Sequence, residues 1–259
     1  MKKKALPLLA FVLSNLFALK SSGQECSGCS GVNQSPVEIA NAIPLTRAMK
    51  LDISKSKKPL ETAYAQDPVT NKAINIEAEL SHHDKSYFIT LNNISYKFSN
   101  VHFHLHSEHK LDNRFYDMEA HFVFKSDKAS EGAVVIGMLI NKASKGHAAF
   151  AILDSLVQGI QYTAQTLPDT NSYHFSSSVN PDAFMLDRFL KGGYYSYTGS
   201  LTTPKYSEGI TWIVLSQSEY IDAAYYNMFS TIQSRYQFGK ARDLQPINNR
   251  IIVSAAAGK

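Results

Sequence analysis

Histidines are concentrated in one short stretch of this chain. Five of the nine fall between residues 102 and 121. His102, His104 and His106 are each two residues apart, so in a β-strand their imidazoles point to the same face. Glu119 and His121 have the same spacing. If the two segments form adjacent antiparallel strands joined by a turn, imidazoles from both strands converge on one point.

Three neutral imidazoles that meet on a rigid sheet form a zinc site of the catalytic kind, in which one coordination position stays open. A single histidine is more often a surface or hydrogen-bonded core residue, and this is the default interpretation of His82, His83, His147 and His174. The cluster differs because it lies in apolar, aromatic sequence, where an imidazole without a partner is costly. From spacing alone, a metal site and a set of structural histidines are equally good interpretations.

The motifs around these histidines resemble those of the alpha class of carbonic anhydrases. The matching segments are His-Phe-His at 102–104, Ser-Glu-His at 107–109, Met-Glu-Ala-His at 118–121, Gln-Ser-Pro-Val-Glu-Ile at 34–39, Gly-Ser-Leu-Thr-Thr-Pro at 199–204, and residues 207–215 and 242–250. These blocks follow the family order along most of the chain. Several separated motifs in the right order are far stronger evidence than any one of them.

The resemblance implies a zinc enzyme that reversibly hydrates carbon dioxide to bicarbonate and a proton by means of zinc-bound hydroxide. It assigns His102, His104 and His121 as the ligands of Zn²⁺. Asn100 and Glu119 fall where the family places hydrogen-bond partners for His102 and His121. The family residue at position 100 is commonly the longer glutamine, so we expect Asn100 to need a shift or a bridging water to make this contact.

The resemblance also implies a catalytic pair, Thr202 and Glu108. The threonine hydroxyl would accept a hydrogen bond from the hydroxide and donate one to the buried carboxylate, which orients the attack on the substrate. Four apolar residues match the wall against which carbon dioxide rests: Val123, Val135, Leu201 and Trp212. As bare sequence these are core residues, and they can be both. We expect a structural role for Arg242.

One departure from the family pattern concerns proton transfer. Many members carry a histidine that relays protons between the metal site and solvent, and Lys72 occupies its place. The unperturbed pKa of lysine is about 10.4, against about 6.5 for histidine, so lysine is a poor relay near neutral pH. We therefore expect an impaired proton shuttle, unless buffer or a histidine at the pocket rim takes the proton; His82 and His83 are weak candidates.

The first 23 residues are typical of a secretory signal peptide. Basic residues 2–4 precede an apolar run over 5–19, and small residues offer a cleavage site near Gly23. The run is short for a membrane span, which favours cleavage over a retained anchor and predicts a secreted or periplasmic protein without a membrane span. Removing its four lysines takes the formal net charge from +4 to about zero, which leaves no basis for a nucleic-acid or acidic-lipid partner.

The two cysteines, Cys26 and Cys29, lie close to the expected mature N-terminus. In an oxidising compartment they could pair with each other or across molecules, and a lipid anchor on either is a weaker option. A thioredoxin-like site would need a preceding strand and a following helix, and neither is indicated. The family often bridges the Cys29 position to a cysteine after the Thr-Thr-Pro motif. Tyr206 stands at that place, so this bridge cannot form.

Apolar periodicity indicates mainly β structure. The predicted strands are 74–78, 87–91, 94–98, 133–140 and 212–215. The predicted helices are 147–160, a turn over 181–189, and 218–232 with Ser218 as its N-cap. With the resemblance, this predicts an α+β, mainly β fold: one domain over 24–259, built around a large, mostly antiparallel twisted sheet with short peripheral helices.

Two alternatives to an enzyme stay open. A catalytically silent relative would only bind a partner, but such proteins typically lose a zinc histidine and all three are present here. A zinc-scavenging protein would bind additional metal through His106, which lies beyond the ligand pair, and His109. Zinc content measured together with hydration activity separates these alternatives. The sequence leaves the oligomeric state open, and the small-molecule substrate is the only partner it implies.

Overall fold

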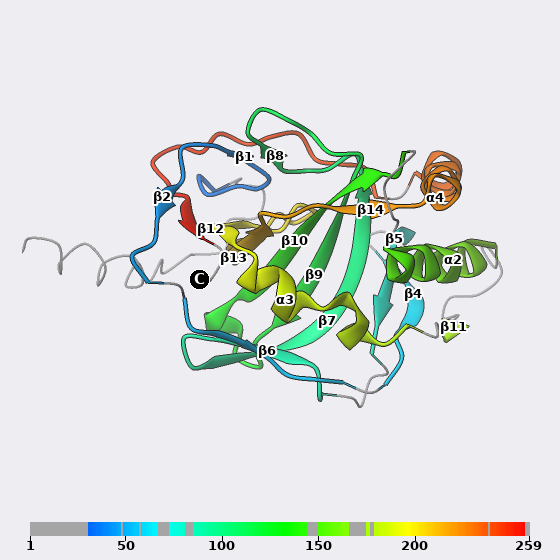
Figure 1. Cartoon of the computed structure of the whole chain (residues 1–259), viewed down its shortest axis with the longest axis horizontal. Helices are drawn as coiled ribbons and strands as arrows, with labels where there is room; N and C mark the ends of the chain where they lie inside the picture. Colours follow the sequence, from blue (N-terminus) through cyan, green and yellow to red (C-terminus); the bar gives the residue numbers. More distant parts are fainter. Residues whose placement is uncertain are drawn as a thin grey trace, which may run out of the picture. The chain divides into compact units, whose positions relative to one another are not determined.

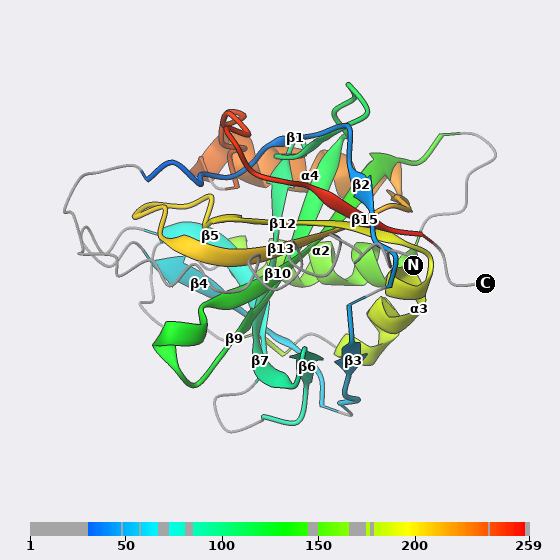
Figure 2. The same cartoon turned by 90° about the vertical axis from the view of Figure 1, so that its left-hand side faces the viewer.

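A twisted β-sheet dominates the structure, which is a computed structural model (Figures 1 and 2). The structure describes residues 31–47, 49–56, 58–66, 73–80, 85–144, 150–165, 175–176, 179–237 and 239–256. Several sequence predictions lie outside these residues: the signal segment, Cys26, Cys29, Lys72, His82, His83, His147 and His174. Within the described ranges, no helix combines the length and apolar character needed to cross a membrane.

The strands are short apart from four long ones at the centre of the sheet. In chain order they are β1 (Glu38–Ile39), β2 (Ile43–Pro44), β3 (Leu51–Ile53), β4 (Glu61–Gln66), β5 (Ala73–Glu79), β6 (Phe88–Leu91), β7 (Ile94–Leu105), β8 (Lys110–Leu111), β9 (Met118–Lys125), β10 (Ala133–Lys142), β11 (Phe175–Ser176), β12 (Tyr194–Ser200), β13 (Glu208–Leu215), β14 (Glu219–Ile221) and β15 (Val253–Ala255). The helices are η1 (Ala129–Glu131), α2 (Ala151–Gln165), η2 (Pro181–Phe184), α3 (Leu186–Lys191) and α4 (Ala223–Tyr236).

The main sheet follows the strand order β11-β4-β5-β7-β9-β10-β13-β12-β15-β2, with β14 paired to β10 and β6 linking β3 to β7. Most neighbours are antiparallel, and the parallel pairs are β10–β13, β10–β14 and β15–β2. Strands β1 and β8 form a separate two-stranded sheet. The prediction of a large, mostly antiparallel twisted sheet with short helices is confirmed.

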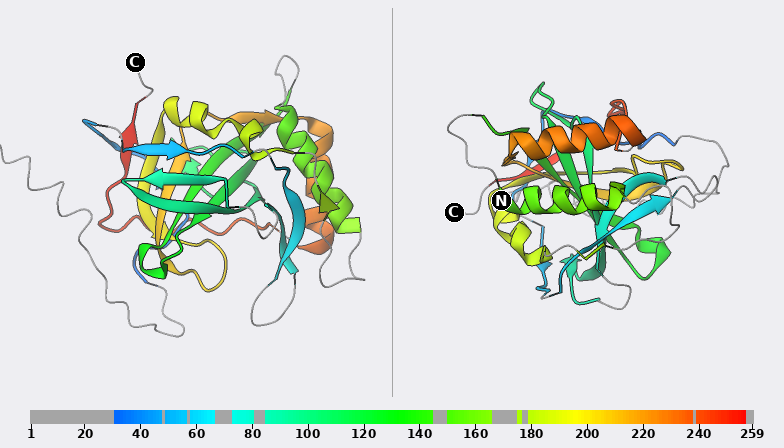
Figure 3. Two further views of the ribbon diagram at one scale, coloured as in Figure 1. Left: turned by 90° about the horizontal axis from the view of Figure 1, so that it is seen from below. Right: turned by 90° about the vertical axis from the view of Figure 1, so that its right-hand side faces the viewer.

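One face of the central strands packs against the helices. Phe103 of β7, Phe122 of β9 and Ile136 of β10 are buried in one apolar cluster with Leu156 of α2 and Phe189 of α3. Helices α2 and α4 lie side by side at one end of the sheet (Figure 3). Because side chains alternate along a strand, the residues between these apolar ones face the opposite side of the sheet. That opposite face carries the histidines.

A bulge in β7 decides which residues reach this opposite face. Pairing with β9 shifts register between Phe98 and Asn100, so Ser99 is an extra residue in the strand. Before the bulge, the even-numbered Phe98 points into the helix-side cluster; after it, the odd-numbered Val101 and Phe103 do. A one-residue bulge reverses the alternation. The even-numbered residues from Asn100 onward are thereby placed on the face away from the helices.

The predicted helix over 218–232 starts later than its sequence pattern indicated. Glu219–Ile221 form strand β14, which pairs in parallel with the end of β10. The N-cap is Asp222, whose Oδ1 accepts the amide of Ala224 at 2.7 Å. The Ser218 hydroxyl, predicted as the cap, instead accepts a hydrogen bond from Asn141 Nδ2 at 3.1 Å. Sheet pairing therefore competes successfully with helix formation in this segment.

The other two helical predictions hold with changed boundaries. Helix α2 begins at Ala151 and ends at Gln165, and the apolar face predicted for it is buried. The turn predicted over 181–189 is divided into η2 and α3. Met185 lies between them in the left-handed region, with φ of 49°. Its N–H bonds to the carbonyl of Asp182, which closes the first turn before the next helix begins.

Asp222→Ala is expected to lower the free energy of unfolding by about 1 kcal/mol, because the Ala224 amide loses its acceptor. Asp222→Asn keeps an acceptor oxygen and should stay close to the wild type. Urea denaturation with an unchanged m-value is the measurement. Equal destabilisation in the two variants would show that the side chain does not act as a cap.

Candidate active site

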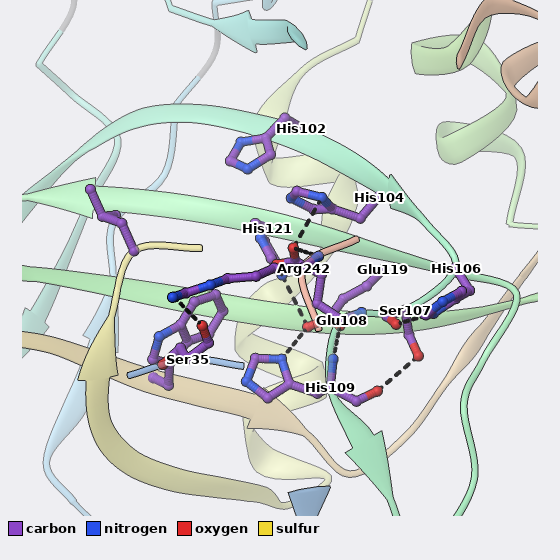
Figure 4. A network of polar contacts seen from close by, with 12 residues as sticks. Ser35, His102, His104, His106, Ser107, Glu108, His109, Glu119, His121 and Arg242 are labelled. Carbon is purple, nitrogen blue, oxygen red and sulfur yellow. Dashed lines mark hydrogen bonds and ion pairs between the residues drawn. The ribbon is translucent and has the colours of Figure 1, made fainter. Parts of the chain in front are cut away.

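Strands β7 and β9 bring three histidines together. They are antiparallel neighbours, with His102 directly opposite His121 and His104 opposite Glu119. The ring centroids of His102 lie 5.2 Å from His104 and 5.4 Å from His121, and those of His104 and His121 are 4.6 Å apart. Figure 4 shows the three imidazoles grouped above the polar network of the site. The structure therefore brings His102, His104 and His121 together, as the sequence predicted.

Two of the imidazoles are oriented through Nδ1. His102 Nδ1 lies 2.8 Å from Asn100 Oδ1, two residues earlier on the same strand face. The expected shift or bridging water is therefore not needed, because the shorter amide reaches its partner directly. His104 Nδ1 lies 3.4 Å from the carbonyl oxygen of Lys240. Donation from Nδ1 leaves the Nε2 lone pair of each ring available to a metal.

Glu119 is the centre of the buried polar network. Its Oε2 accepts the backbone N–H groups of Glu108 and His109, each at 2.8 Å. Its Oε1 lies 2.7 Å from His109 Nδ1 and 3.1 Å from His121 Nε2. Burial by itself raises the pKa of this carboxyl, but His109 and His121 outweigh that effect and hold the pKa well below its ordinary value. Glu119 is therefore ionised.

The surroundings set the charge state of the imidazoles. Burial lowers the pKa of His102 well below its ordinary value, and the neighbouring histidines add to this. Burial also lowers the pKa of His104, only partly opposed by Glu108. For His121, burial lowers the pKa, but Glu119 and Glu108 more than offset it and raise the pKa overall. Neutral His102 and His104 are suited to binding a metal, and the two carboxylates favour positive charge beside His121.

The buried charges of the site fit a divalent cation. Glu108 and Glu119 are both fully buried. In the part of the chain that the structure describes, their side chains form ion pairs only with histidines. Three buried atoms there make no hydrogen bond of good geometry: His104 Nε2, His121 Nε2 and Glu108 Oε2. His121 Nε2 nevertheless lies close to both carboxylates, 3.1 Å from Glu119 Oε1 and 3.8 Å from Glu108 Oε2. Buried carboxylates are costly unless compensated, and nitrogen ligands beside them suit zinc. The residues present therefore fit Zn²⁺.

The predicted pair of Thr202 and Glu108 is only half assembled. Thr202 is buried, but the described residues contain no hydrogen bond between its hydroxyl and Glu108. Glu108 Oε1 accepts the backbone N–H of Arg242 at 2.8 Å. Its Oε2 has no hydrogen-bond partner and lies 3.8 Å from His121 Nε2. One oxygen of this carboxylate is thus fixed by the backbone, and the other is left as an acceptor.

A buried chain of hydrogen bonds extends from Glu119 and was not identified from the sequence. His109 Nε2 lies 2.7 Å from the hydroxyl of Tyr197, which donates to Ser35 Oγ at 2.8 Å. Burial raises the pKa of Tyr197 well above its ordinary value, so this phenol stays protonated. The only sequence signal was that Ser35 and His109 stand inside the matching motifs, whereas Tyr197 carried none.

The prediction that His106 shares a strand face with His102 and His104 is wrong, because the strand ends before it. Strand β7 ends at Leu105, and the exposed His106 ring lies 4.9 Å from that of Phe115. His109, the other histidine of the zinc-scavenging alternative, has both ring nitrogens engaged by Glu119 and Tyr197. Among the described residues, the two groupings able to hold a metal share His121. The described residues therefore give the scavenging alternative no independent second site.

The four predicted wall residues gather beside the imidazoles. Val123, Val135 and Trp212 are buried in one apolar cluster, and the half-buried Leu201 packs against it. Val135 and Trp212 are direct partners across β10 and β13. The Trp212 ring lies 4.8 Å from that of His121. Trp212 thus places this apolar cluster beside the histidines.

Comparisons with known proteins agree with this geometry. The family model described as eukaryotic-type carbonic anhydrase matches residues 20–256. The carbonic anhydrase of Pectobacterium atrosepticum is 27% identical over 226 residues, covering 86% of this chain and 80% of that protein. The carbonic anhydrase of Neisseria gonorrhoeae is 28% identical over 226 residues, covering 87% and 79%. The solved structure of Photobacterium profundum alpha-carbonic anhydrase has a TM-score of 0.67 and 26% identity, covering 86% of this chain and 89% of that one.

Gly137 lies opposite His121 across β9 and β10, where a Cβ atom would meet Glu119 Oε1 at 2.7 Å. Gly137→Ala is expected to displace this carboxylate and to weaken zinc binding by about 10- to 100-fold. Gly192→Ala is the matched control, because its Cβ would meet Gln217 Oε1, the end of an exposed side chain. Chelator competition measures the affinity, and near-UV circular dichroism verifies folding. Equal affinities in the two folded variants would contradict the prediction.

Proposed function

The chain belongs to the eukaryotic-type carbonic anhydrase family, and on that premise we propose that it catalyses the reversible hydration of carbon dioxide to bicarbonate and a proton. The proposal assigns Zn²⁺ to His102, His104 and His121. The observation that carries it is the imidazole triad, with His102 half-buried and the other two buried, set against two buried carboxylates that lack a lysine or arginine side-chain partner in the described residues. This arrangement supplies both the ligands and the charge that zinc requires.

When bound, zinc lowers the pKa of a water molecule to about 7, a magnitude known for carbonic anhydrases as a class, and so supplies a nucleophile at neutral pH. The chain contributes rigidity around that chemistry. Asn100 fixes the ring of His102, and Glu119 lies against the ring of His121. Because such partners restrict ring orientation, they keep the ligand nitrogens directed at one point.

Thr202 and Glu108 would orient the nucleophile. The free Oε2 of Glu108 can only accept a hydrogen bond while the carboxylate is ionised. A Thr202 hydroxyl that donates to it has only lone pairs left to offer. Thr202 would therefore accept a hydrogen bond from the nucleophile, which would leave a lone pair of the nucleophile directed toward the carbon of the substrate.

Carbon dioxide would rest against the apolar boundary of the site. Val123, Val135, Leu201 and Trp212 offer it no hydrogen-bond donor, because the one indole N–H is already bonded to the carbonyl of Ser200 at 2.9 Å. An apolar wall suits a substrate without net charge or dipole and favours release of the charged bicarbonate product.

The finer parts of the proposal rest on sequence. We place a cleaved signal peptide at 1–23 and the catalytic domain at 24–259, in a secreted or periplasmic protein. Lys72 at the relay position implies slow proton transfer to solvent. A catalytically silent relative and a zinc-scavenging protein are the competing outcomes of the tests below.

His104→Ala is expected to lose stoichiometric zinc and nearly all carbon dioxide hydration, because one of three ligands is removed. His106→Ala is the matched control and should retain one zinc per chain and full activity. Metal analysis and stopped-flow hydration on the same samples are the measurements. One zinc without hydration in the wild type would indicate a silent binding protein. More than one zinc, reduced by His106→Ala, would indicate scavenging.

Wild-type turnover is expected to rise steeply with imidazole concentration, because external buffer replaces the missing internal relay. Lys72→His should raise turnover in imidazole-free buffer and flatten the dependence, while kcat/KM stays nearly constant. Stopped-flow hydration across imidazole concentrations measures both effects. Fast wild-type turnover that does not depend on imidazole would refute the impaired shuttle without affecting the zinc assignment.

A further inference from the structure

The loop that carries Thr202 connects β12 to β13 and is closed by two backbone hydrogen bonds. Leu201 N–H donates to the Ser207 carbonyl at 2.9 Å, and Tyr206 N–H donates to the Thr203 carbonyl at 2.8 Å. Tyr206 has a φ of 53°, in the left-handed region. A bulky aromatic residue is rare in this conformation and persists only where its surroundings hold it.

What holds Tyr206 is the guanidinium of Arg242, whose Cζ lies 3.8 Å from the ring centroid. The guanidinium is itself fixed, because Nη1 donates to the Ser35 carbonyl at 2.7 Å and to Gln34 Oε1 at 3.0 Å. Gln34 Nε2 in turn donates to the Tyr206 carbonyl at 3.2 Å. A planar guanidinium fixed by hydrogen bonds can stack on an aromatic ring in a way that a lysine cannot.

The same arginine reaches the other member of the catalytic pair. Its backbone N–H donates to Glu108 Oε1, while its side chain stacks on the Thr202 loop. Figure 4 shows Arg242 extending past Glu108 toward Ser35. One residue therefore contacts both the carboxylate that must accept a hydrogen bond and the loop that carries the donor.

We propose that the stack of Arg242 on Tyr206 is a positioning device that sets the Thr202 hydroxyl against the free oxygen of Glu108. Tyr206 acts through its ring face, since its hydroxyl has no hydrogen bond with the described part of the chain. Arg242 links the loop to the carboxylate, which exceeds the structural role expected from sequence. This inference rests on the function proposed for the site.

Tyr206→Asn is the central variant, because asparagine tolerates the left-handed conformation but cannot stack. We expect kcat/KM for carbon dioxide hydration to fall by about 10- to 100-fold, the range that loss of orientation by about 1 Å produces. One zinc per chain should remain bound. Tyr206→Phe keeps the ring and should restore most of the lost kcat/KM.

Tyr116→Asn is the matched control, because Arg114 stacks on Tyr116 at 4.6 Å on a different loop. It makes the same chemical change to the same kind of pair and should leave hydration unaltered. Arg242→Gln is a second test variant that keeps the backbone N–H to Glu108 and removes the cation. It should match Tyr206→Asn, and the double variant should be no worse than either single one, as expected of residues acting as one unit.

Ligand selectivity separates positioning from general destabilisation. A Thr202 hydroxyl held by Glu108 can accept a hydrogen bond from a ligand but cannot donate one. Tyr206→Asn should therefore weaken binding of benzenesulfonamide, which carries N–H groups, by a larger factor than binding of thiocyanate, which carries none. A merely structural role would change the two affinities equally.

The outcomes separate the two proposals. A wild-type protein without zinc-dependent hydration would overturn the proposed function. An active wild type, with hydration and the sulfonamide-to-thiocyanate affinity ratio unchanged in Tyr206→Asn and Arg242→Gln, would overturn the positioning role alone. Equal losses in Tyr206→Phe and Tyr206→Asn would also overturn it, because the stacked ring is then irrelevant.

Discussion

The buried negative charge of Glu119 is the constraint on which the rest of the site depends. A fully buried carboxylate is tolerated only when hydrogen-bond donors and positive charge surround it. Backbone amides of Glu108 and His109 supply the donors, and Gly137 leaves the space that the carboxylate occupies. His109 carries the network onward to Tyr197. A metal beside His121 would complete the compensation, so the network and the metal site support one another.

The geometry of the site also depends on the register between the strands of the sheet. His102 and His121 are direct partners on β7 and β9, and a slip of one residue would turn one of them toward the helices. The apolar cluster beneath, with Phe103 and Phe122, opposes such a slip because it would expose those rings. Apolar packing on the helix-covered face of the sheet therefore fixes the strand register, and the register fixes the positions of the histidines on the opposite face.

Long-range tethers complete the active-site rim. The Thr202 loop is bound at one side through Gln34 and stacked at the other by Arg242, which also donates to Glu108. These contacts join four segments of the chain, at residues 34, 108, 202–206 and 242. Non-covalent contacts thus tether this loop to the rest of the site.

The sequence by itself determined the ligand spacing, the matching motifs and several central strands of the sheet, because these depend on residue type and on periodicity along one segment. Only the tertiary structure decided the bulge at Ser99, the start of α4 after Asp222 and the direct contact of Asn100 with His102. It alone also brought Tyr197 to Ser35, across 162 positions of the chain. Such features arise from pairing between distant segments, so they cannot be predicted from the periodicity of one segment.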